Sequence, residues 1–399
     1  MVYIDYSKYL NYAAIVYALL LPLSRAGVSI FTALLILLWI LEGNFQEKIK
    51  LLFNNKVVIA IMAFLCINFI SLFWSDDVVS SLNYIRTYWY MLPMIALFTS
   101  LKKEYISKVL TAFIFGMFIS EIIAYGVFFE IWEFKNVTPE NPTPFMHHIE
   151  YSIFLAFSAL VLLSRIFNEG DIKSKLMYLF FFITMTGNLF LTAGRTGQIA
   201  FILALFILAL VSFKNKLKAF IISICLSVLM LGVAYQFSDT FHQRVEIAQS
   251  NVENVIKQGD YCSSWGRRIG AYITAKDIVA QSPVLGVGII DNMDEFRKLV
   301  DDKYPEMGCI KELQHMHNQY LQILTQLGFV GLLIFLVIFY TIGTIHLEKG
   351  EFYYIKYTYL TVLLFALIPE VLLHRAFSLT LFSLIIGLLL AQERIEHEQ

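Results

Sequence analysis

Long apolar stretches separated by short polar connections dominate the chain. Twelve of them are long enough, or nearly so, to cross a hydrocarbon layer, because a spanning helix needs about 20 apolar residues and must pair its backbone groups internally. They are residues 8–24, 26–42, 57–74, 81–100, 105–131, 149–167, 176–193, 197–213, 219–237, 318–345, 356–373 and 376–392. The pattern predicts an all-α polytopic membrane protein with about 12 transmembrane helices.

Composition agrees with this interpretation. Of the 399 residues, 58% are hydrophobic and 15% are charged, whereas soluble domains have roughly 45–50% apolar and about 25% charged residues. An apolar excess of this size has to face lipid. The formal net charge of −1 gives no bulk attraction to nucleic acid, so we expect no such partner.

Lysine and arginine alternate between the two sets of short loops. One set holds the lysines and arginines of segments 48–56, 102–108, 165–175, 214–218 and 349–356, whereas the opposite set holds only Arg25, Lys135, Arg195 and Arg375. Because positive loops stay in the cytoplasm, we expect both termini to be cytoplasmic. The external loops are then 75–80, 132–148, 194–196, 238–317 and 374–375.

The chain therefore divides into residues 1–237 with nine spans, an external segment at 238–317, and residues 318–399 with three spans and a cytoplasmic tail. Within the external segment, apolar residues at helical spacing predict helices at about 241–257 and 264–280, the second ending before Pro283. Cys262 and Cys309 also lie here and could pair in an oxidising compartment. Two unpaired thiols are equally compatible with the sequence.

Two histidines stand where the external segment meets the tenth apolar stretch. His315 and His317 are two residues apart, and on a helix this spacing points side chains away from each other, which is poor geometry for a shared metal. No neighbouring Asp, Glu or Cys cluster completes a tetrahedral set. A neutral imidazole near pH 7 suits a general base, which makes His317 a catalytic candidate. An interfacial histidine satisfied by backbone groups is the alternative.

Arginines near the expected outer ends of spans are candidates for binding an anion. Arg195 lies in a tight turn with two glycines, where backbone N–H groups can approach an oxyanion, although it could also reach lipid head groups. Arg267 and Arg268 begin the second predicted external helix, and their guanidinium groups match phosphate oxygens or simply face water. Arg86 lies inside the fourth stretch, where a charge by default marks a binding site.

Other ionisable residues give weaker indications. Asp76 and Asp77 could hold a divalent cation, but nothing else in the sequence supports a metal, and a solvated loop explains them equally well. Glu370 and Arg375 are compatible with a structural ion pair. We expect neither a metal nor a cofactor.

Three motifs together resemble the O-antigen ligase and polymerase family of bacterial envelopes. The sequence HNQYLQIL from His317, followed by LGFVG, is similar to the family's H-N-x-Y-L…L-G-x-x-G signature. Arg268 and Tyr272, leading into SPVLGVG, resemble its R-x-x-x-aromatic helix and P-x-x-G-x-G end, with tyrosine where the family usually has tryptophan. LTAGRTG around Arg195 resembles its T-x-S/G-R turn. The matches cover roughly residues 185–335.

The resemblance implies a GT-C-like bundle of twelve helices in the bacterial inner membrane, with a helical periplasmic loop between the ninth and tenth spans. It implies a glycosyltransferase that moves a glycan from undecaprenyl diphosphate to an acceptor hydroxyl, with inversion and without metal. Carried onto this chain, it makes His317 the base and makes Arg195 and Arg268 ligands of the diphosphate. Further candidates for substrate binding are Arg86, Arg267 and His315.

Several activities compete. A ligase with a lipid A–core acceptor is favoured over a polymerase that extends the glycan, and membrane lipids are the remaining expected partners. The compact chain lacks a large C-terminal external domain, which argues against a protein O-glycosyltransferase. A lipid-linked glycan transporter would distribute polar residues along several spans, whereas the unusual residues here gather near the outer face. A scaffold would not need Arg195, Arg268 and His317 on one side.

Overall fold

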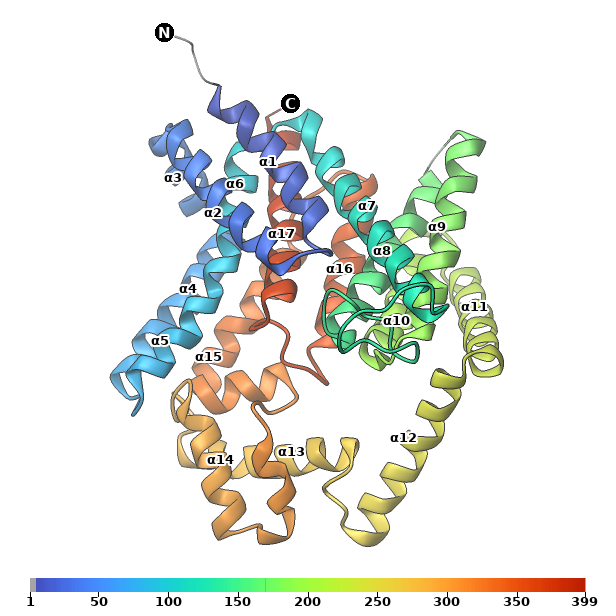
Figure 1. The fold of residues 1–399 in the computed structure, drawn as a ribbon. Coiled ribbons are helices and arrows are strands. Elements are labelled where there is room, and N and C mark those ends of the chain that lie inside the picture. The colour runs from blue at the N-terminus through green and yellow to red at the C-terminus, as the bar shows by residue number, and fades with distance from the viewer. Residues whose placement is uncertain (1–4, 169, 399) are drawn as a thin grey trace.

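The computed structural model describes residues 5–168 and 170–398, and within them the regular structure is helical apart from one isolated bridge between Thr138 and Asn141 (Figure 1). The helices are α1 (Tyr6–Leu20), α2 (Arg25–Glu42), α3 (Phe45–Asn54), α4 (Lys56–Ile70), η1 (Ser71–Phe73), α5 (Val78–Arg86), η2 (Thr87–Met91), α6 (Leu92–Ser100), α7 (Lys103–Phe128), α8 (His148–Asn168), α9 (Ile172–Leu191), α10 (Arg195–Ser212), α11 (Lys216–Phe237), α12 (Asp239–Gln258), α13 (Ser264–Gln281), α14 (Asp291–Asp302), η3 (Pro305–Glu312), α15 (Gln319–Gly343), α16 (Glu351–Ala366) and α17 (Ala376–His397). The predicted all-α polytopic class is confirmed.

The number of spans is less certain than the class. In the described part of the chain, nine helices are long and apolar enough to cross a membrane. Each of the other three expected stretches contains helix, but α1 and α16 have only 15 and 16 residues, and the stretch at 81–100 is broken into α5, η2 and α6. The prediction of about 12 spans is therefore not confirmed as a count.

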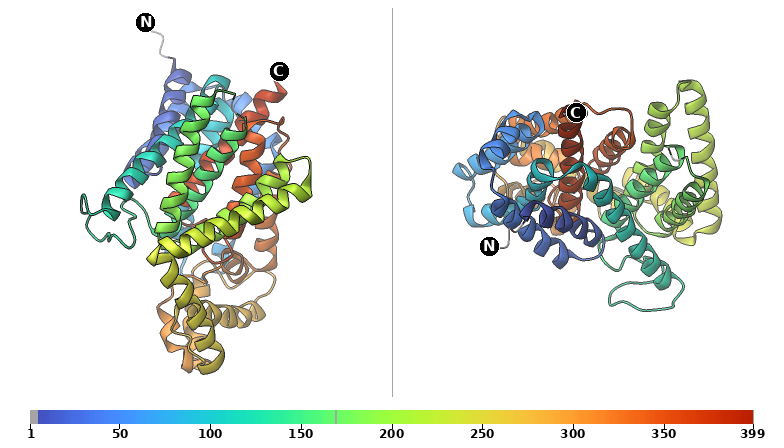
Figure 2. Two further views of the ribbon diagram at one scale, coloured as in Figure 1. Left: turned by 90° about the vertical axis from the view of Figure 1, so that its right-hand side faces the viewer. Right: turned by 90° about the horizontal axis from the view of Figure 1, so that it is seen from above.

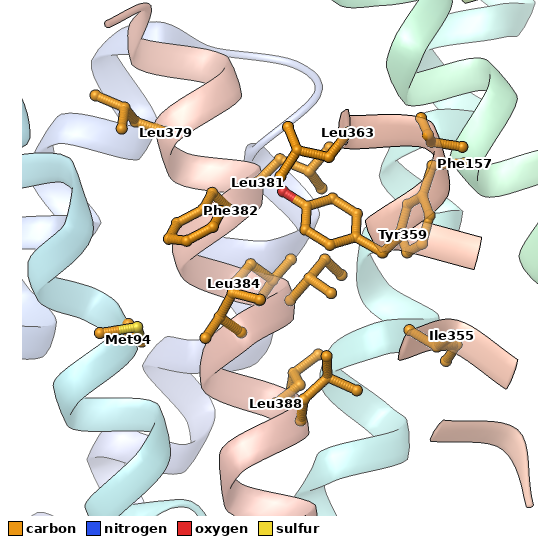
Figure 3. Close-up of a cluster of buried hydrophobic side chains, with 14 of the residues drawn as sticks. Met94, Phe157, Ile355, Tyr359, Leu363, Leu379, Leu381, Phe382, Leu384 and Leu388 are labelled. Carbon is orange, nitrogen blue, oxygen red and sulfur yellow. The ribbon is translucent and has the colours of Figure 1, made fainter. Parts of the chain in front are cut away.

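The bundle is built around α8 and α17, which are mostly buried, whereas α2 and α11 expose most of their apolar surface. Figure 3 shows Phe382, Leu384 and Leu388 of α17 packed among residues of α6, α8 and α16, including Tyr359. Viewed from above, α9, α10 and α11 stand together at one side of the bundle (Figure 2). Their exposed leucine, isoleucine and phenylalanine side chains are explained by contact with lipid.

The segment from α12 to η3 projects beyond one end of the bundle, opposite the end where α1 begins and α17 finishes (Figure 1). Helices α12 and α13 confirm the helices predicted at about 241–257 and 264–280, whereas α14 and η3 were not predicted. Helices α13, α14 and η3 enclose a small apolar core of their own. Its buried members are Ala271, Ala275, Ile278, Met293, Phe296, Val300, Met307, Ile310, Leu313 and Met316.

Helix α15 is broken at Gly328, where φ is +63°, and the loop after α13 is inserted into the break. The amides of Val287 and Gly288 donate to carbonyls of α15, and the amides of Phe329 and Val330 donate to carbonyls of the loop, at N···O distances of 2.9–3.2 Å. Backbone groups released by a broken spanning helix need such partners, because lipid offers none. The loop thereby docks the projecting segment onto the membrane bundle.

Candidate active site

A cavity of about 420 Å³ lies between the membrane bundle and the projecting segment. Four separate parts of the chain contribute polar groups to it: the start of α8, the turn before α10, the first turns of α13, and the loop after α16. The residues are His148, Ile149, Ala193, Arg195, Thr196, Ile199, Ser264, Trp265, Arg268, Ile269, Tyr272, Ile368, Pro369 and Glu370. Two of the three predicted site residues, Arg195 and Arg268, therefore line one cavity.

The two arginines converge on a single hydroxyl group. Arg268 donates from Nη1 to the Oγ of Ser264 at 3.1 Å and to its carbonyl oxygen at 3.0 Å, one turn back on α13. Nη2 of Arg195 donates to the same Oγ at 3.5 Å. Two guanidinium groups at one small cavity make a strong site for an anion with several oxygens, such as a diphosphate.

Glu370 is the main group that sequence reasoning underestimated. Its side chain is 1% exposed, and its Oε1 accepts a hydrogen bond from Nη2 of Arg268 at 2.8 Å. Arg375, the expected partner, lies farther away, 3.8 Å from Oε2. The expected ion pair of Glu370 with Arg375 is therefore present, but Glu370 pairs more closely with Arg268 and also lines the cavity.

His317 lies next to Glu370 in a strained backbone conformation. Its Nδ1 is 3.9 Å from Oε2 of Glu370, and both atoms are buried without a hydrogen-bond partner among the described residues. The φ angle of His317 is +50°, a region that costs a non-glycine residue about 1–2 kcal/mol. Such strain persists only where the surroundings hold it, and it is common at functional sites.

Contacts from three elements hold this conformation. Tyr272 of α13 directs its hydroxyl group to the carbonyl oxygens of His317 and Ile368, at 3.3 and 3.4 Å. Gln319, at the start of α15, accepts with its side-chain Oε1 from the backbone amide of Leu373 at 2.9 Å. Its backbone amide donates to the carbonyl oxygen of Leu367. The loop that carries Glu370 is thus fastened over His317.

The histidines at this site are neutral near pH 7. Burial lowers the pKa of His317 to about 3, and His315 and Arg268 act in the same direction. Burial likewise lowers the pKa of His315 to about 4 and raises the pKa of Glu370, against the opposing charges of Arg268 and Arg375.

The expectation that His315 and His317 point apart is wrong, because the segment between η3 and α15 is not helical. Their rings lie 4.4 Å apart, and the amide of His317 donates to Nδ1 of His315. His315, His317 and Glu370 each place one potential metal-ligand atom within 4.8 Å of the others. A carboxylate therefore does lie beside the two histidines, although the sequence indicated none nearby. A cation there would face Arg268 and Arg375 at close range, which opposes its binding.

The remaining candidates lie apart from the cavity. Arg267 turns back and donates from Nε to the carbonyl oxygen of Cys262 at 3.1 Å. Arg86, at the end of α5, is exposed and does not line the cavity. Asp77 caps α5 by accepting from the amide of Ser80, and the amide of Asp76 donates to Asp291. The carboxylate of Asp77 therefore has a structural role as a helix cap, whereas the contact of Asp76 involves only its backbone.

The cysteines of the projecting segment are joined. Cys262 and Cys309 form a disulfide, whereas Cys66 and Cys225 are free and exposed. Of the two alternatives that the sequence left open, the structure therefore has the paired one.

A second cavity, also of about 420 Å³, lies between α9 and α11 and is almost entirely apolar. It is lined by Phe182, Ile183, Thr186, Gly187, Phe190, Leu191, Leu226, Leu229, Met230, Val233, Ala234, Phe237 and Ser238. Leu191 lines this cavity and Ala193 lines the arginine cavity, so a single residue, Thr192, lies between these two lining residues along the chain.

Comparison with known proteins finds a family model that matches part of the chain. Residues 180–336 match the family model described as O-antigen ligase. An uncharacterized protein of Haemophilus influenzae is 25% identical over 224 residues, which cover 53% of this chain and 55% of that protein. The chain thus spans about half the length of this relative. The matched segment contains Arg195, Arg268 and His317. The chain is therefore a polytopic membrane protein, and its segment from α9 into α15 is similar to the O-antigen ligase family.

Proposed function

We propose that this protein is a glycosyltransferase that moves a glycan from undecaprenyl diphosphate to a hydroxyl group of a lipid A–core acceptor. The observation that carries the proposal is the convergence of Arg195 and Arg268 on Ser264, in a cavity bordered by Glu370 beside His317. Arg195 and Arg268 bind the diphosphate, and His317 accepts the proton of the attacking hydroxyl.

The proposed reaction needs one proton acceptor and stabilisation of one leaving group. The acceptor oxygen attacks the anomeric carbon, the bond from that carbon to the phosphate oxygen breaks, and inversion follows from attack on the far side. The two guanidinium groups stabilise the charge that develops on the departing diphosphate. Nδ1 of His317 is buried and directed at Glu370, so Nε2 is the nitrogen that takes the proton.

The apolar cavity between α9 and α11 suits the lipid part of the same donor. A polyprenyl chain is apolar and flexible, and the cavity wall is built from leucine, valine, phenylalanine and methionine side chains. Its distance of one short turn from Arg195 fits a molecule whose diphosphate follows directly on its hydrocarbon chain.

The proposed location is the bacterial inner membrane, with both termini in the cytoplasm and the cavity at the periplasmic face. The disulfide in the projecting segment supports this orientation, because disulfides persist in the periplasm and are rare in the cytoplasm. The lysine-rich short loops belong to the opposite end. At the periplasmic face, the lipid tail stays in the membrane while the sugars stay in water.

Reconstitution with defined substrates tests the proposal. The purified protein is given undecaprenyl-diphosphate glycan and lipid A–core in excess EDTA, and products are separated on gels. We expect glycan on lipid A–core with wild type but much less of it with His317→Ala. The matched control is His346→Ala, which changes an exposed histidine beyond the other end of α15 and should transfer like wild type. Lengthening of the lipid-linked glycan alone would assign a polymerase, and the absence of both products with competent substrates would contradict glycan transfer.

A further inference from the structure

We infer that the Cys262–Cys309 disulfide is a positioning element of the donor cavity, because it ties the first turn of α13 to the segment that ends in His317. The inference rests on the proposed function for its catalytic consequence. Its structural part, the fixed placement of Arg268, stands on contacts alone.

The first turn of α13 has little packing of its own. The buried residues that α13 gives to the small core are Ala271, Ala275 and Ile278, which all follow Arg268. Before Arg268, Trp265 is exposed, and the buried Gly266 packs against the backbone of the preceding loop. The end of α13 that carries the phosphate-binding group therefore lies at the edge of the core.

The partner side of the disulfide is firmly held. Cys309 lies in η3 between Met307 and Ile310, which are 3% and 0% exposed. The chain then continues through buried Leu313 and Met316 directly to His317. The disulfide from this segment to Cys262 therefore restrains the residues at the start of α13, which have few buried apolar contacts of their own.

Hydrogen bonds carry this fixation from the disulfide to the arginines. Cys262 directly precedes Ser263, whose hydroxyl oxygen caps α13 by accepting from the amide of Gly266 at 3.1 Å. The carbonyl oxygen of Cys262 accepts from Nε of Arg267 at 3.1 Å. Ser264 follows Ser263 in the chain, and its hydroxyl group is the one that both cavity arginines contact.

Reduction should therefore loosen the cavity without dismantling the membrane bundle. The bundle core is separate from the small core, and the remaining cysteines of the described chain, Cys66 and Cys225, are free. Cys262 is exposed, so a water-soluble reductant reaches it. A misplacement of about 1 Å at a reacting centre costs up to roughly a hundredfold in rate.

The experiment compares oxidised and TCEP-reduced full-length protein in lipid nanodiscs, with the Cys262→Ser/Cys309→Ser variant and the control Cys66→Ser/Cys225→Ser. Amide hydrogen exchange of residues 264–272 reports the position of α13 directly. We expect reduction, or loss of the disulfide pair, to accelerate this exchange at least about tenfold while residues 376–390 of α17 stay protected. The control variant keeps the exchange rates of wild type.

Transfer kinetics then separate positioning from general stability. We expect kcat/KM for the lipid-linked donor to fall between about tenfold and a hundredfold on reduction, and Arg268→Lys to cost less in the reduced protein than in the oxidised one. Unchanged exchange and unchanged kcat/KM in protein with four titrated thiols would overturn the inference. Accelerated exchange in a protein that transfers no glycan even when oxidised would refute the proposed function and leave the positioning role intact.

Discussion

Removal of Arg268 is the perturbation whose consequences the structure fixes most closely. Glu370 is 1% exposed and receives its only hydrogen bond shorter than 3 Å in the described structure from Arg268, at 2.8 Å. In Arg268→Ala its remaining cation is Arg375 at 3.8 Å. Leaving a buried charge without its partner costs about 3–5 kcal/mol, and we expect the lower end, because Glu370 can take up a proton instead.

The second substitution Glu370→Gln tests this reason for the loss. A neutral amide needs no cation, so Arg268→Ala/Glu370→Gln should regain more than half of the free energy of unfolding that Arg268→Ala loses. Activity should stay low in both variants, because neither restores the guanidinium group that we propose binds the diphosphate. Unfolding in detergent micelles and glycan transfer measure the two effects separately.

Arg297→Ala is the matched control, because Arg297 pairs with Asp294 at 2.9 Å on an exposed face of α14. Exposed pairs contribute less than about 1 kcal/mol, so this variant should unfold almost as wild type does. If the double variant were no more stable than Arg268→Ala, the charge of Glu370 would not be the cause. If Arg297→Ala lost as much free energy of unfolding as Arg268→Ala, the burial of the Arg268–Glu370 pair would not explain the loss.

Three further predictions concern the base, the docking loop and the lipid cavity. Since the pKa of His317 falls from the ordinary 6.5 to about 3 on folding, the unfolded chain binds more protons between these values, and stability should decline as pH falls from 6.5 towards 3. His317→Gln should make the unfolding midpoints at pH 7 and pH 5 more alike than they are in wild type. The same difference between the two midpoints in both proteins would contradict this. Gly286→Ala should cost at least about 2 kcal/mol, because φ is +72° and a Cβ would lie 2.4 Å from the α15 backbone, whereas Gly343→Ala, with open space around it, should be tolerated in the same unfolding assay. Ala234→Phe fills the apolar cavity and should raise KM roughly tenfold for the full-length polyprenyl donor but not for a short-chain donor, whereas equal effects would remove the cavity from donor binding.

The sequence predicted the helices of the membrane bundle because apolar length alone identifies them. The stretches at 149–167 and 176–193 correspond to α8 and α9 within a few residues. It did not predict the break in α15, because a glycine such as Gly328 inside an apolar stretch is compatible with a continuous helix. The break exists because the distant loop at 283–288 supplies the missing hydrogen bonds.

The candidate site could be predicted only where the signal lies in residues close together in the sequence. Arg195 and Arg268 were singled out by turns and motifs near them in the sequence, and the structure brings both to one cavity. Glu370 was singled out only as a partner of Arg375, and its approach to His317 carries no local signal, because it stands 53 residues after His317 and reaches it through the loop that Gln319 holds. The helical spacing argument for His315 failed because residues 313–318, between η3 and α15, are not helical, and His317 itself is left-handed.

Donor binding measured apart from transfer tests the central assignment most directly. Wild type, Arg195→Ala, Arg268→Ala and His317→Ala would each be titrated with undecaprenyl diphosphate in nanodiscs, and each assayed for glycan transfer. We predict that the arginine variants lose at least about tenfold in affinity, whereas His317→Ala binds like wild type and transfers at least about a hundredfold more slowly. Unchanged affinity in both arginine variants, or normal transfer by His317→Ala, would contradict the account.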